Sequence, residues 1–238
     1  MAIPAPVYWI QEERLDQQFP GTTAALTEPN GLLAAGGDLS PERLLGAYRQ
    51  GIFPWFSENQ PILWWAPNPR SILYPDGLKI SRSLRKTIRR EPFAVTVDHA
   101  FADVIRACAE PRRGEPGTWV TQTMIDAYET LHEHGYAHSV ECWSDNNLVG
   151  GLYGIALGRV FFGESMFSRA TDASKIAMVN LAAWLCEWGY ELVDCQVHNP
   201  HLESLGAMTI DRAEFDALLT RYCTQTPVNS AWCDRAIS

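Results

Sequence analysis

The sequence predicts an α+β protein with a mixed β-sheet. Three strand-like segments between residues 137 and 168 are separated only by short turns, which predicts antiparallel neighbours. A long apolar helix over residues 173–189 then leads into one more strand, over residues 190–199. Strands and helices do not alternate regularly along the rest of the chain, so the pattern does not favour a purely parallel α/β fold.

The first third of the chain is rich in turn residues, aromatic residues and prolines. Ser40 followed by Pro41 predicts the N-cap and first residue of a helix that ends at Gly51. Two aromatic, proline-rich segments follow and end near residue 70. We therefore expect a small N-terminal domain over residues 1–70 and a larger domain over residues 71–238.

The larger domain is predicted to begin with a strand at 71–75, a basic helix at 81–90 and a strand at 93–98. Two helices follow, one capped by Asp98 and one with Thr123 and Asp126 in capping-box spacing. Asn146-Asn147 and Gly158-Arg159 are the predicted hairpin turns. A last helix is predicted to begin at Asp211, with Glu214 completing a capping box.

Composition limits the possible functions. With 28 acidic and 19 basic residues, the net charge of −9 argues against non-specific binding of nucleic acid. Six scattered cysteines without a Cys-x-x-Cys pair are typical of reduced thiols in a cytoplasmic protein. We expect neither a membrane-spanning helix nor an export signal. His132, His134 and His138 lack a partner at a familiar ligand spacing, so we expect no metal site.

One segment is strongly basic. Between Lys79 and Arg90 lie six basic residues and no acidic one, and several recur at helical spacing on one face: Lys79, Arg82, Arg85, Lys86, Arg89 and Arg90. Such a face is either simply solvated or binds phosphate groups. The residues alone leave both interpretations open.

Four tryptophans flank predicted turns: Trp55, Trp64, Trp65 and Trp119. Their rings could stack on a base, although most tryptophans belong to a core.

The strand at 190–199 places Asp194, Gln196 and His198 on one face by its period of two. An acid and an amide projecting together form either a structural hydrogen-bond network or a site that orients a nucleophile.

Glu164 lies inside an otherwise apolar segment, Val160 to Ser168. Burying a carboxylate without a partner costs on the order of several kcal/mol, because the charge loses its hydration. Glu164 is therefore expected either to pair with Arg159 or Arg169, or to act as the counter-charge for a cationic substrate.

The motifs "EPNGLLAAGGDLSPERLLGAYRQGIFPWF", "PILWWAPNPR", "SRSLRK", "GTWVT", "GGLYG", "FFGESMFS" and "DCQVHN" occur in this order. Together they resemble the leucyl/phenylalanyl-tRNA–protein transferases, over most of the chain from about Glu28 to Ala207. The resemblance implies a small N-terminal domain and a larger domain similar to the GCN5-related N-acetyltransferases, with a splayed sheet.

The resemblance also implies an activity: transfer of leucine or phenylalanine, and weakly methionine, from aminoacyl-tRNA to proteins with N-terminal arginine or lysine. The product is a degradation signal in the bacterial cytoplasm under the N-end rule. The partners are then charged tRNA and acceptor proteins. No cofactor is expected, because the tRNA ester is already activated, and we assume a monomer.

Site roles follow from the same resemblance. Asp194 and Gln196 match the catalytic pair, in which Gln196 accepts a hydrogen bond from the attacking α-amino group and Asp194 polarises it. Glu164 would contact the basic N-terminal residue, and Trp55 and Trp119 would hold the 3′-terminal adenosine. The side-chain pocket would be lined by Leu152, Phe161, Met166, Met178 and Val193; Leu152 stands where methionine is expected, which affects the preference between leucine and phenylalanine.

The resemblance gives the basic segment a role as well, because an acidic protein must segregate its cations to hold tRNA. We expect Lys79, Arg82, Arg85, Lys86 and Arg89 to contact the acceptor-stem backbone. Two other functions compete with this one. An acetyl-CoA-dependent N-acyltransferase would need a pyrophosphate-binding loop, and "RLLGAY" at 43–48 is not a complete copy of one. A non-catalytic tRNA-binding module would not need Asp194, Gln196 and Glu164 together.

Overall fold

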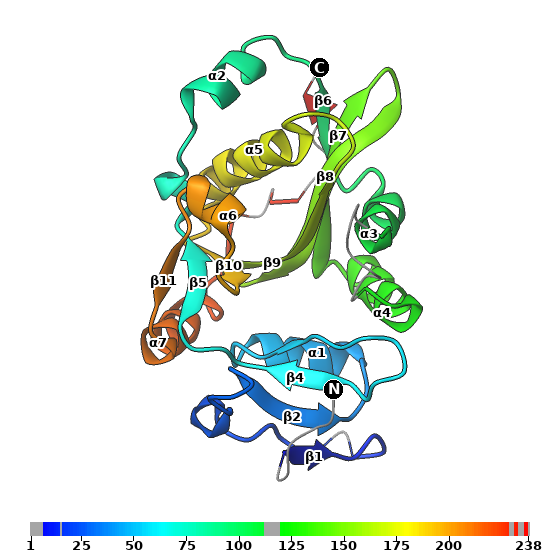
Figure 1. The fold of residues 1–238 in the computed structure, drawn as a ribbon, viewed down its shortest axis with the longest axis vertical. Helices are drawn as coiled ribbons and strands as arrows, with labels where there is room; N and C mark the ends of the chain where they lie inside the picture. Colours follow the sequence, from blue (N-terminus) through cyan, green and yellow to red (C-terminus); the bar gives the residue numbers. More distant parts are fainter. Residues whose placement is uncertain (1–6, 15, 112–119, 229–230, 233–235, 238) are drawn as a thin grey trace.

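A computed structural model describes residues 7–14, 16–111, 120–228, 231–232 and 236–237. Within them the chain forms two sheets, one of four strands and one of eight, with helices between and around them (Figure 1). The α+β class with a mixed sheet is confirmed. In the larger sheet β9 and β10 are parallel, and the other pairs of described strands are antiparallel.

The small sheet has the order β1-β2-β4-β3. Its strands are β1 (Tyr8–Ile10), β2 (Leu32–Gly36), β4 (Leu63–Trp65) and β3 (Phe53–Pro54). A 3₁₀ turn, η1 (Thr22–Ala24), precedes β2, and helix α1 (Pro41–Tyr48) follows it. As the sequence predicts, the Ser40 hydroxyl caps α1 by accepting from the Arg43 amide at 3.4 Å, and Gly51 adopts φ +73° just after it.

The large sheet has the order β11-β5-β10-β9-β8-β7-β6-β12. Its strands are β5 (Arg70–Leu73), β6 (Ala94–Val97), β7 (Ala137–Ser144), β8 (Asn147–Leu157), β9 (Val160–Ser168), β10 (Leu192–Gln196), β11 (Met208–Ile210) and β12 (Ala236–Ile237). Gly158-Arg159 forms the second hairpin turn, as predicted. The first turn instead uses Asp145 and Asn146, whose φ angles of 48° and 63° suit a two-residue hairpin loop.

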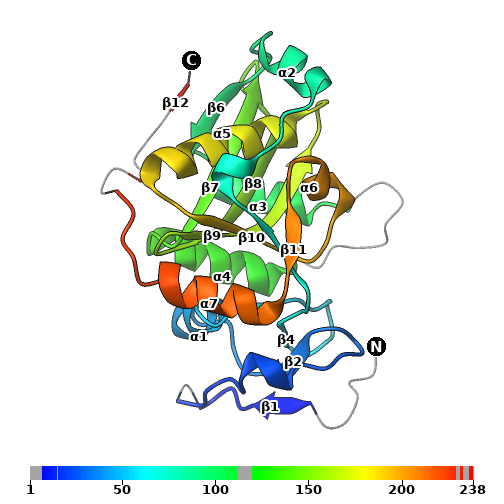
Figure 2. The ribbon, with the colours of Figure 1, turned by 90° about the vertical axis from the view of Figure 1, so that its left-hand side faces the viewer.

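Six helices accompany this sheet in the described chain: α2 (Arg82–Ile88), α3 (Phe101–Ala109), α4 (Gln122–Glu133), α5 (Ala173–Trp188), α6 (Pro200–Ser204) and α7 (Arg212–Tyr222), with a short 3₁₀ turn η2 (Pro75–Gly77). Helix α5 covers one face of the sheet, and α3 and α4 cover the other. Figures 1 and 2 place α1, α4 and α7 between the two sheets. A continuous apolar core therefore joins the small sheet to one face of the large one.

Two predicted helix caps lie at the wrong residues, and a third lacks the expected side-chain bond. Asp98 does not cap α3, because its carboxylate accepts from the Ser139 amide at 2.8 Å and lies 2.7 Å from His138 Nδ1. Helix α4 is capped by Thr121, two residues before the predicted Thr123. Asp211 does occupy the N-cap of α7, but its side chain makes no capping hydrogen bond.

Candidate active site

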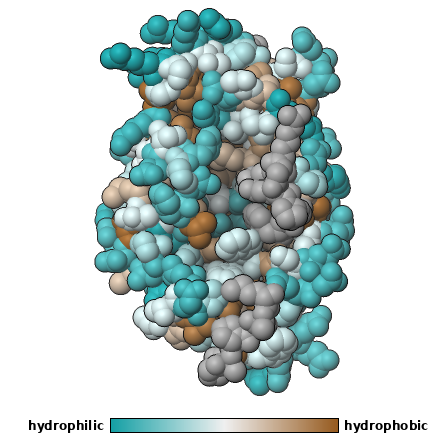
Figure 3. Space-filling view, in the orientation of Figure 1, coloured by the Kyte–Doolittle hydropathy of each residue, from teal (hydrophilic) through white to brown (hydrophobic). Residues whose placement is uncertain are grey.

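A pocket of about 1070 Å³ lies between β9, β10, α5 and α6. The end of α3 and the turn after β3 also border it. The face drawn in Figure 3 is hollowed near its centre, over the region where α5, β9 and β10 converge in Figure 1. Seven of the residues predicted to bind substrate line this pocket, together with the predicted catalytic pair: Trp55, Leu152, Phe161, Glu164, Met166, Met178, Val193, Asp194 and Gln196.

The pocket exists because β9 and β10 separate. Their parallel pairing extends as far as Asp194 opposite Phe162. Beyond that point the pairing of each strand with its other neighbour is irregular. Glu164 has no partner residue in the pairing of β9 with β8, and Cys195 has none in the pairing of β10 with β5. Bulges of this kind bend a strand and redirect its side chains, often beside active sites.

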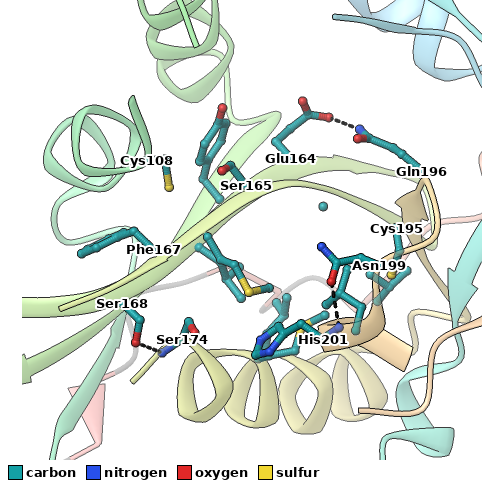
Figure 4. A pocket seen from close by; sticks show the side chains of 18 of the residues that line it. Cys108, Glu164, Ser165, Phe167, Ser168, Ser174, Cys195, Gln196, Asn199 and His201 are labelled. Atoms are coloured by element: carbon teal, nitrogen blue, oxygen red, sulfur yellow. Dashed lines mark hydrogen bonds between the residues drawn. The ribbon is translucent and has the colours of Figure 1, made fainter. Parts of the chain in front are cut away.

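Two side chains bridge the strands where their backbones have parted. Gln196 Nε2 donates a hydrogen bond to Glu164 Oε1 at 2.8 Å (Figure 4). Both side chains are buried, each with 8% of its surface exposed. Because the amide nitrogen of Gln196 points to Glu164, its amide oxygen points away from that carboxylate.

No described arginine pairs with Glu164, which removes one of the two alternatives that the sequence left open. The Tyr48 hydroxyl donates to Oε1 at 2.7 Å, and the Tyr128 hydroxyl donates to Oε2 at 3.1 Å. The nearby guanidinium groups are used elsewhere, since Arg169 pairs with Glu110 and Arg159 with Glu191.

Burial raises the pKa of Glu164 to about 7, and the nearby charge of Asp194 contributes to the rise. The hydrogen bonds from the two tyrosines and Gln196 oppose it. Glu164 is therefore poised to change its charge near neutral pH.

Asp194 forms a buried, bidentate ion pair with Arg70. Arg70 Nε lies 2.8 Å from Oδ1 and Nη2 lies 2.6 Å from Oδ2. The guanidinium is held between the rings of Phe53 and Phe215, at 4.9 and 4.6 Å from their centroids. The charge of Asp194 is thus neutralised by the guanidinium of Arg70, which does not line the pocket.

Asp194 acts on Gln196 through the backbone. Its Oδ1 accepts from the Gln196 amide at 2.9 Å, and Gln196 adopts φ +63°, which is uncommon for a residue other than glycine. Strand β10 ends there, and His198 is exposed beyond it, so the predicted face of three residues is reduced to two. The carboxylate therefore fixes the turn that aims the Gln196 side chain.

The opposite part of the pocket is apolar. Phe161 and Val193 lie in the paired parts of β9 and β10, and Met178 lies on α5. All three line the pocket. Leu152 on β8 is buried opposite Met166 on β9. Leu181, which sequence reasoning missed, extends this wall along α5. These side chains suit a medium or large apolar group.

Trp55 lies at the rim of the pocket with 43% of its surface exposed. Its ring centroid is 5.6 Å from that of Trp65, whose indole nitrogen donates to the Trp55 carbonyl at 2.7 Å. The rim therefore offers a positioned aromatic surface. Trp119, the other predicted adenosine-binding residue, lies outside the described residues. Trp64 is fully buried, in line with the core interpretation.

The basic residues lie outside the pocket, on α2 and directly before and after it. All six, from Lys79 to Arg90, are exposed, and none makes an ion pair with a described residue. Thr87 of α2 donates to Asp172 at 3.0 Å, immediately before α5. This bond places α2 beside the start of the helix that borders the pocket (Figure 1).

Sequence reasoning missed three residues that hold the polar end of the site: Arg70, Tyr48 and Tyr128. No local pattern marks them, although a buried carboxylate always requires partners. Among the described residues, no group of three or more His, Cys, Asp or Glu side chains could hold a metal ion.

The pocket joins an apolar chamber, suited to an acyl group, to an acid–amide pair suited to an amine. This arrangement defines a group-transfer enzyme. Family models agree: the model described as leucyl/phenylalanyl-tRNA protein transferase matches residues 72–220, and that of its N-terminal domain matches residues 37–68. The chain belongs to the leucyl/phenylalanyl-tRNA–protein transferase family. It is an aminoacyltransferase whose substrates are aminoacyl-tRNA and protein.

Individual relatives support this assignment. The leucyl/phenylalanyl-tRNA–protein transferase of Stutzerimonas stutzeri is 58% identical over 90% of this chain and 94% of the relative. That of Nitrosomonas europaea is 57% identical over 91% and 92%. The solved structure of L-PGS from Bacillus licheniformis aligns with a TM-score of 0.39 at 13% identity, over 85% of this chain and 65% of that one, which is too low to define a fold. No helix in the described part of the chain could cross a membrane.

Proposed function

We propose that the enzyme transfers leucine or phenylalanine, and weakly methionine, from aminoacyl-tRNA to the α-amino group of proteins that begin with arginine or lysine. One observation carries the proposal: the hydrogen bond between Gln196 and Glu164 stands at the polar end of an apolar chamber. An acyl side chain in the chamber brings its ester carbon toward this pair. An amine bound by the pair is then next to the ester.

In this proposal Gln196 positions the nucleophile. Its amide oxygen accepts a hydrogen bond from the substrate amine, while Asp194 holds its backbone. An α-amino group has a pKa of about 7.7–8.0, so removing its proton at pH 7 costs only about 1 kcal/mol. Most of the rate gain must come from alignment, which can remove roughly 7–11 kcal/mol of barrier. As the amine attacks, the bond from nitrogen to the acyl carbon forms, the ester bond to the ribose oxygen breaks, and the amine loses a proton while that oxygen gains one.

Glu164 is the proposed counter-charge for the basic side chain of the acceptor. A carboxylate has about four acceptor positions. Tyr48, Tyr128 and Gln196 use three of them. One position therefore remains for the substrate, which suits a single hydrogen bond from either lysine or arginine and does not demand a bidentate guanidinium.

The remaining assignments are also proposals. Trp55 and Trp119 hold the terminal adenosine, and Leu152, Phe161, Met166, Met178 and Val193 select the amino acid by volume. The α2 cations, Lys79, Arg82, Arg85, Lys86 and Arg89, contact the acceptor stem, because they are exposed and lack acidic partners among the described residues.

We further propose domains at 1–70 and 71–238, supported by the two separate sheets, and a GCN5-related topology for the larger one, supported by its splayed β9 and β10. The enzyme would act as a monomer in the cytoplasm, where its products are marked for degradation.

The test is transfer of labelled leucine or phenylalanine from charged tRNA to a peptide that begins with arginine, with no cofactor added. Gln196→Ala should lose transfer. Glu164→Ala should weaken it for arginine and lysine peptides, while an α-acetylated peptide should accept nothing from the wild type. Failure of a folded, tRNA-binding wild type to transfer, or a requirement for acetyl-CoA, would contradict the proposal.

A further inference from the structure

Two tyrosines meet at Glu164 from different parts of the fold. Tyr48 is the last residue of α1, beside the small sheet, and Tyr128 lies in the middle of α4. Their side chains are buried, with 1% and 0% of their surfaces exposed. Their hydroxyl groups contact each other as well as Glu164. The Glu164 carboxylate is therefore enclosed by phenols, and no described cation neutralises it.

The number of protons in this cluster links its geometry to the charge of Glu164. Three contacts join the two hydroxyls and the carboxyl group, but the tyrosines supply only two protons. When Glu164 is charged, both protons point to it, and its Oε1 can still accept from Gln196. When Glu164 is protonated, its own proton serves the third contact. Only the protonated state therefore supplies a proton to every contact, whereas the hydrogen bonds that the two tyrosines donate to the carboxylate lower the pKa of Glu164 and favour its charged state.

Both tyrosines keep their protons at any working pH. Burial, followed by the charge of Glu164, raises the pKa of Tyr48 and of Tyr128 well above the ordinary value. Neither can act as a base, and toward the charged Glu164 they act only as hydrogen-bond donors. Their effect on the site is therefore to orient the carboxylate and to favour its charge.

We propose that Tyr48 and Tyr128 are positioning residues of the transfer reaction, which hold Glu164 charged and oriented so that it in turn holds the amide of Gln196 toward the amine. The effect on transfer rests on the proposed function, whereas the hydrogen bonds from the two tyrosines to Glu164 do not depend on it. It also explains why α1 and α4 approach each other at this point of the core. The small sheet thereby contributes to the active site through α1.

Three further described residues influence or are influenced by the charge of Glu164, and they must be distinguished from the two tyrosines when its pKa is measured. Asp194 from β10 raises the pKa of Glu164, and Gln196 lowers it. Burial, followed by the charge of Glu164, raises the pKa of Tyr153 on β8. Its hydroxyl, however, is buried without a hydrogen-bond partner among the described residues. Tyr153→Phe is thus a matched control that removes a phenol oxygen from the same core but no bond to Glu164.

The decisive experiment follows the carboxyl carbon of Glu164 by NMR in protein labelled at glutamate, with the signal assigned by Glu164→Gln. Tyr48→Phe and Tyr128→Phe each remove a hydrogen bond to a charged group, so the midpoint of the titration should rise by about one pH unit or more. Tyr153→Phe should leave the midpoint in place. Unchanged midpoints in the first two folded variants would overturn the inference, whether or not the enzyme transfers amino acids.

Transfer kinetics provide the second measurement. The amine of the peptide titrates identically for every variant, so a difference between profiles of kcat/KM against pH belongs to the enzyme. Tyr48→Phe and Tyr128→Phe should lose about fivefold at pH 7 and recover most of it at pH 8.5, in line with a one-unit shift from a pKa of about 7. A loss of the same size at every pH, matched by Tyr153→Phe, would show that the tyrosines serve only packing.

Discussion

Arg70 on β5 and Asp194 on β10 form a fully buried ion pair, with Nη2 and Oδ2 2.6 Å apart. Their side chains expose 1% and 0% of their surfaces. The pair links β5 to β10, and because Asp194 also accepts from the Gln196 backbone amide, it fixes the turn that carries the Gln196 side chain. One interaction thus stabilises the fold and shapes the site.

Breaking this pair is expected to be costly. Arg70→Met leaves the Asp194 charge buried without a partner, which should destabilise the protein by about 3–5 kcal/mol. Chemical unfolding measures this loss. Arg106→Met is the matched control, because it breaks an exposed pair with Glu129 that is worth roughly 0–1 kcal/mol. Equal effects of the two changes would mean that the Arg70–Asp194 pair contributes no more than a surface ion pair.

The protein should lose stability as the pH rises toward neutrality. The pKa of Glu164 is about 7 in the folded protein, whereas its ordinary value is 4.5. Between these values the folded state binds more protons than the unfolded state, so the free energy of unfolding falls with pH and levels off above pH 7. The total fall is about 3 kcal/mol.

Glu164→Gln should remove this dependence. The free energy of unfolding of the variant, relative to wild type, should therefore increase between pH 4 and pH 8. Unfolding titrations at several pH values measure it, with the exposed Glu58→Gln as control. Parallel pH curves for wild type and Glu164→Gln would disprove the raised pKa.

The basic face of α2 should set the salt dependence of tRNA binding. Arg85→Gln together with Arg89→Gln should weaken binding and reduce the slope of log K against log salt by about 0.7–0.9 for each phosphate that is no longer neutralised. Binding isotherms at several salt concentrations measure the slope. Arg221→Gln, an exposed arginine on α7, should leave it unchanged. An unaltered slope in the double variant would identify the basic face as merely solvated.

The preference between amino acids should respond to Leu152. Leu152→Ala enlarges the apolar chamber, so the ratio of kcat/KM for phenylalanyl-tRNA to that for leucyl-tRNA should rise, by about tenfold or more. Competition between the two charged tRNAs measures this ratio. Leu185→Ala, which creates space in the α5 core away from the pocket, should reduce stability but not alter the ratio. A similar change of this ratio in both variants would show that Leu152 does not select between the two amino acids.

Removing the unpartnered phenol oxygen should stabilise the protein. Tyr153 buries its hydroxyl without a hydrogen bond to any described residue. Tyr153→Phe avoids the cost of that burial, which is about 1–3 kcal/mol, while keeping the ring against Tyr128 and Phe101. Thermal and chemical unfolding measure the gain. A loss of stability would indicate that the hydroxyl has a bound partner.

Features governed by neighbouring residues could be predicted from the sequence. The cap at Ser40, the three consecutive strands and the basic helix all depend on spacing within one or two turns. The apolar lining was also predicted, but by resemblance to known relatives, because an apolar side chain on a strand gives no sign of whether it faces a core or a pocket. The misplaced caps of α3 and α4 show the limit, since several residues near each helix start could serve.

The sequence by itself determined most helices and the central strands of the larger sheet, the charge distribution and the residue types at the site. Only the tertiary structure decided which groups serve Glu164 and Asp194. Tyr48 is 116 residues from Glu164, and Arg70 is 124 residues from Asp194. Periodicity describes one element at a time, whereas these partners meet only after separate elements pack. The burial that raises the pKa of Glu164, and the bulges that part β9 from β10, likewise arise only when the elements come together.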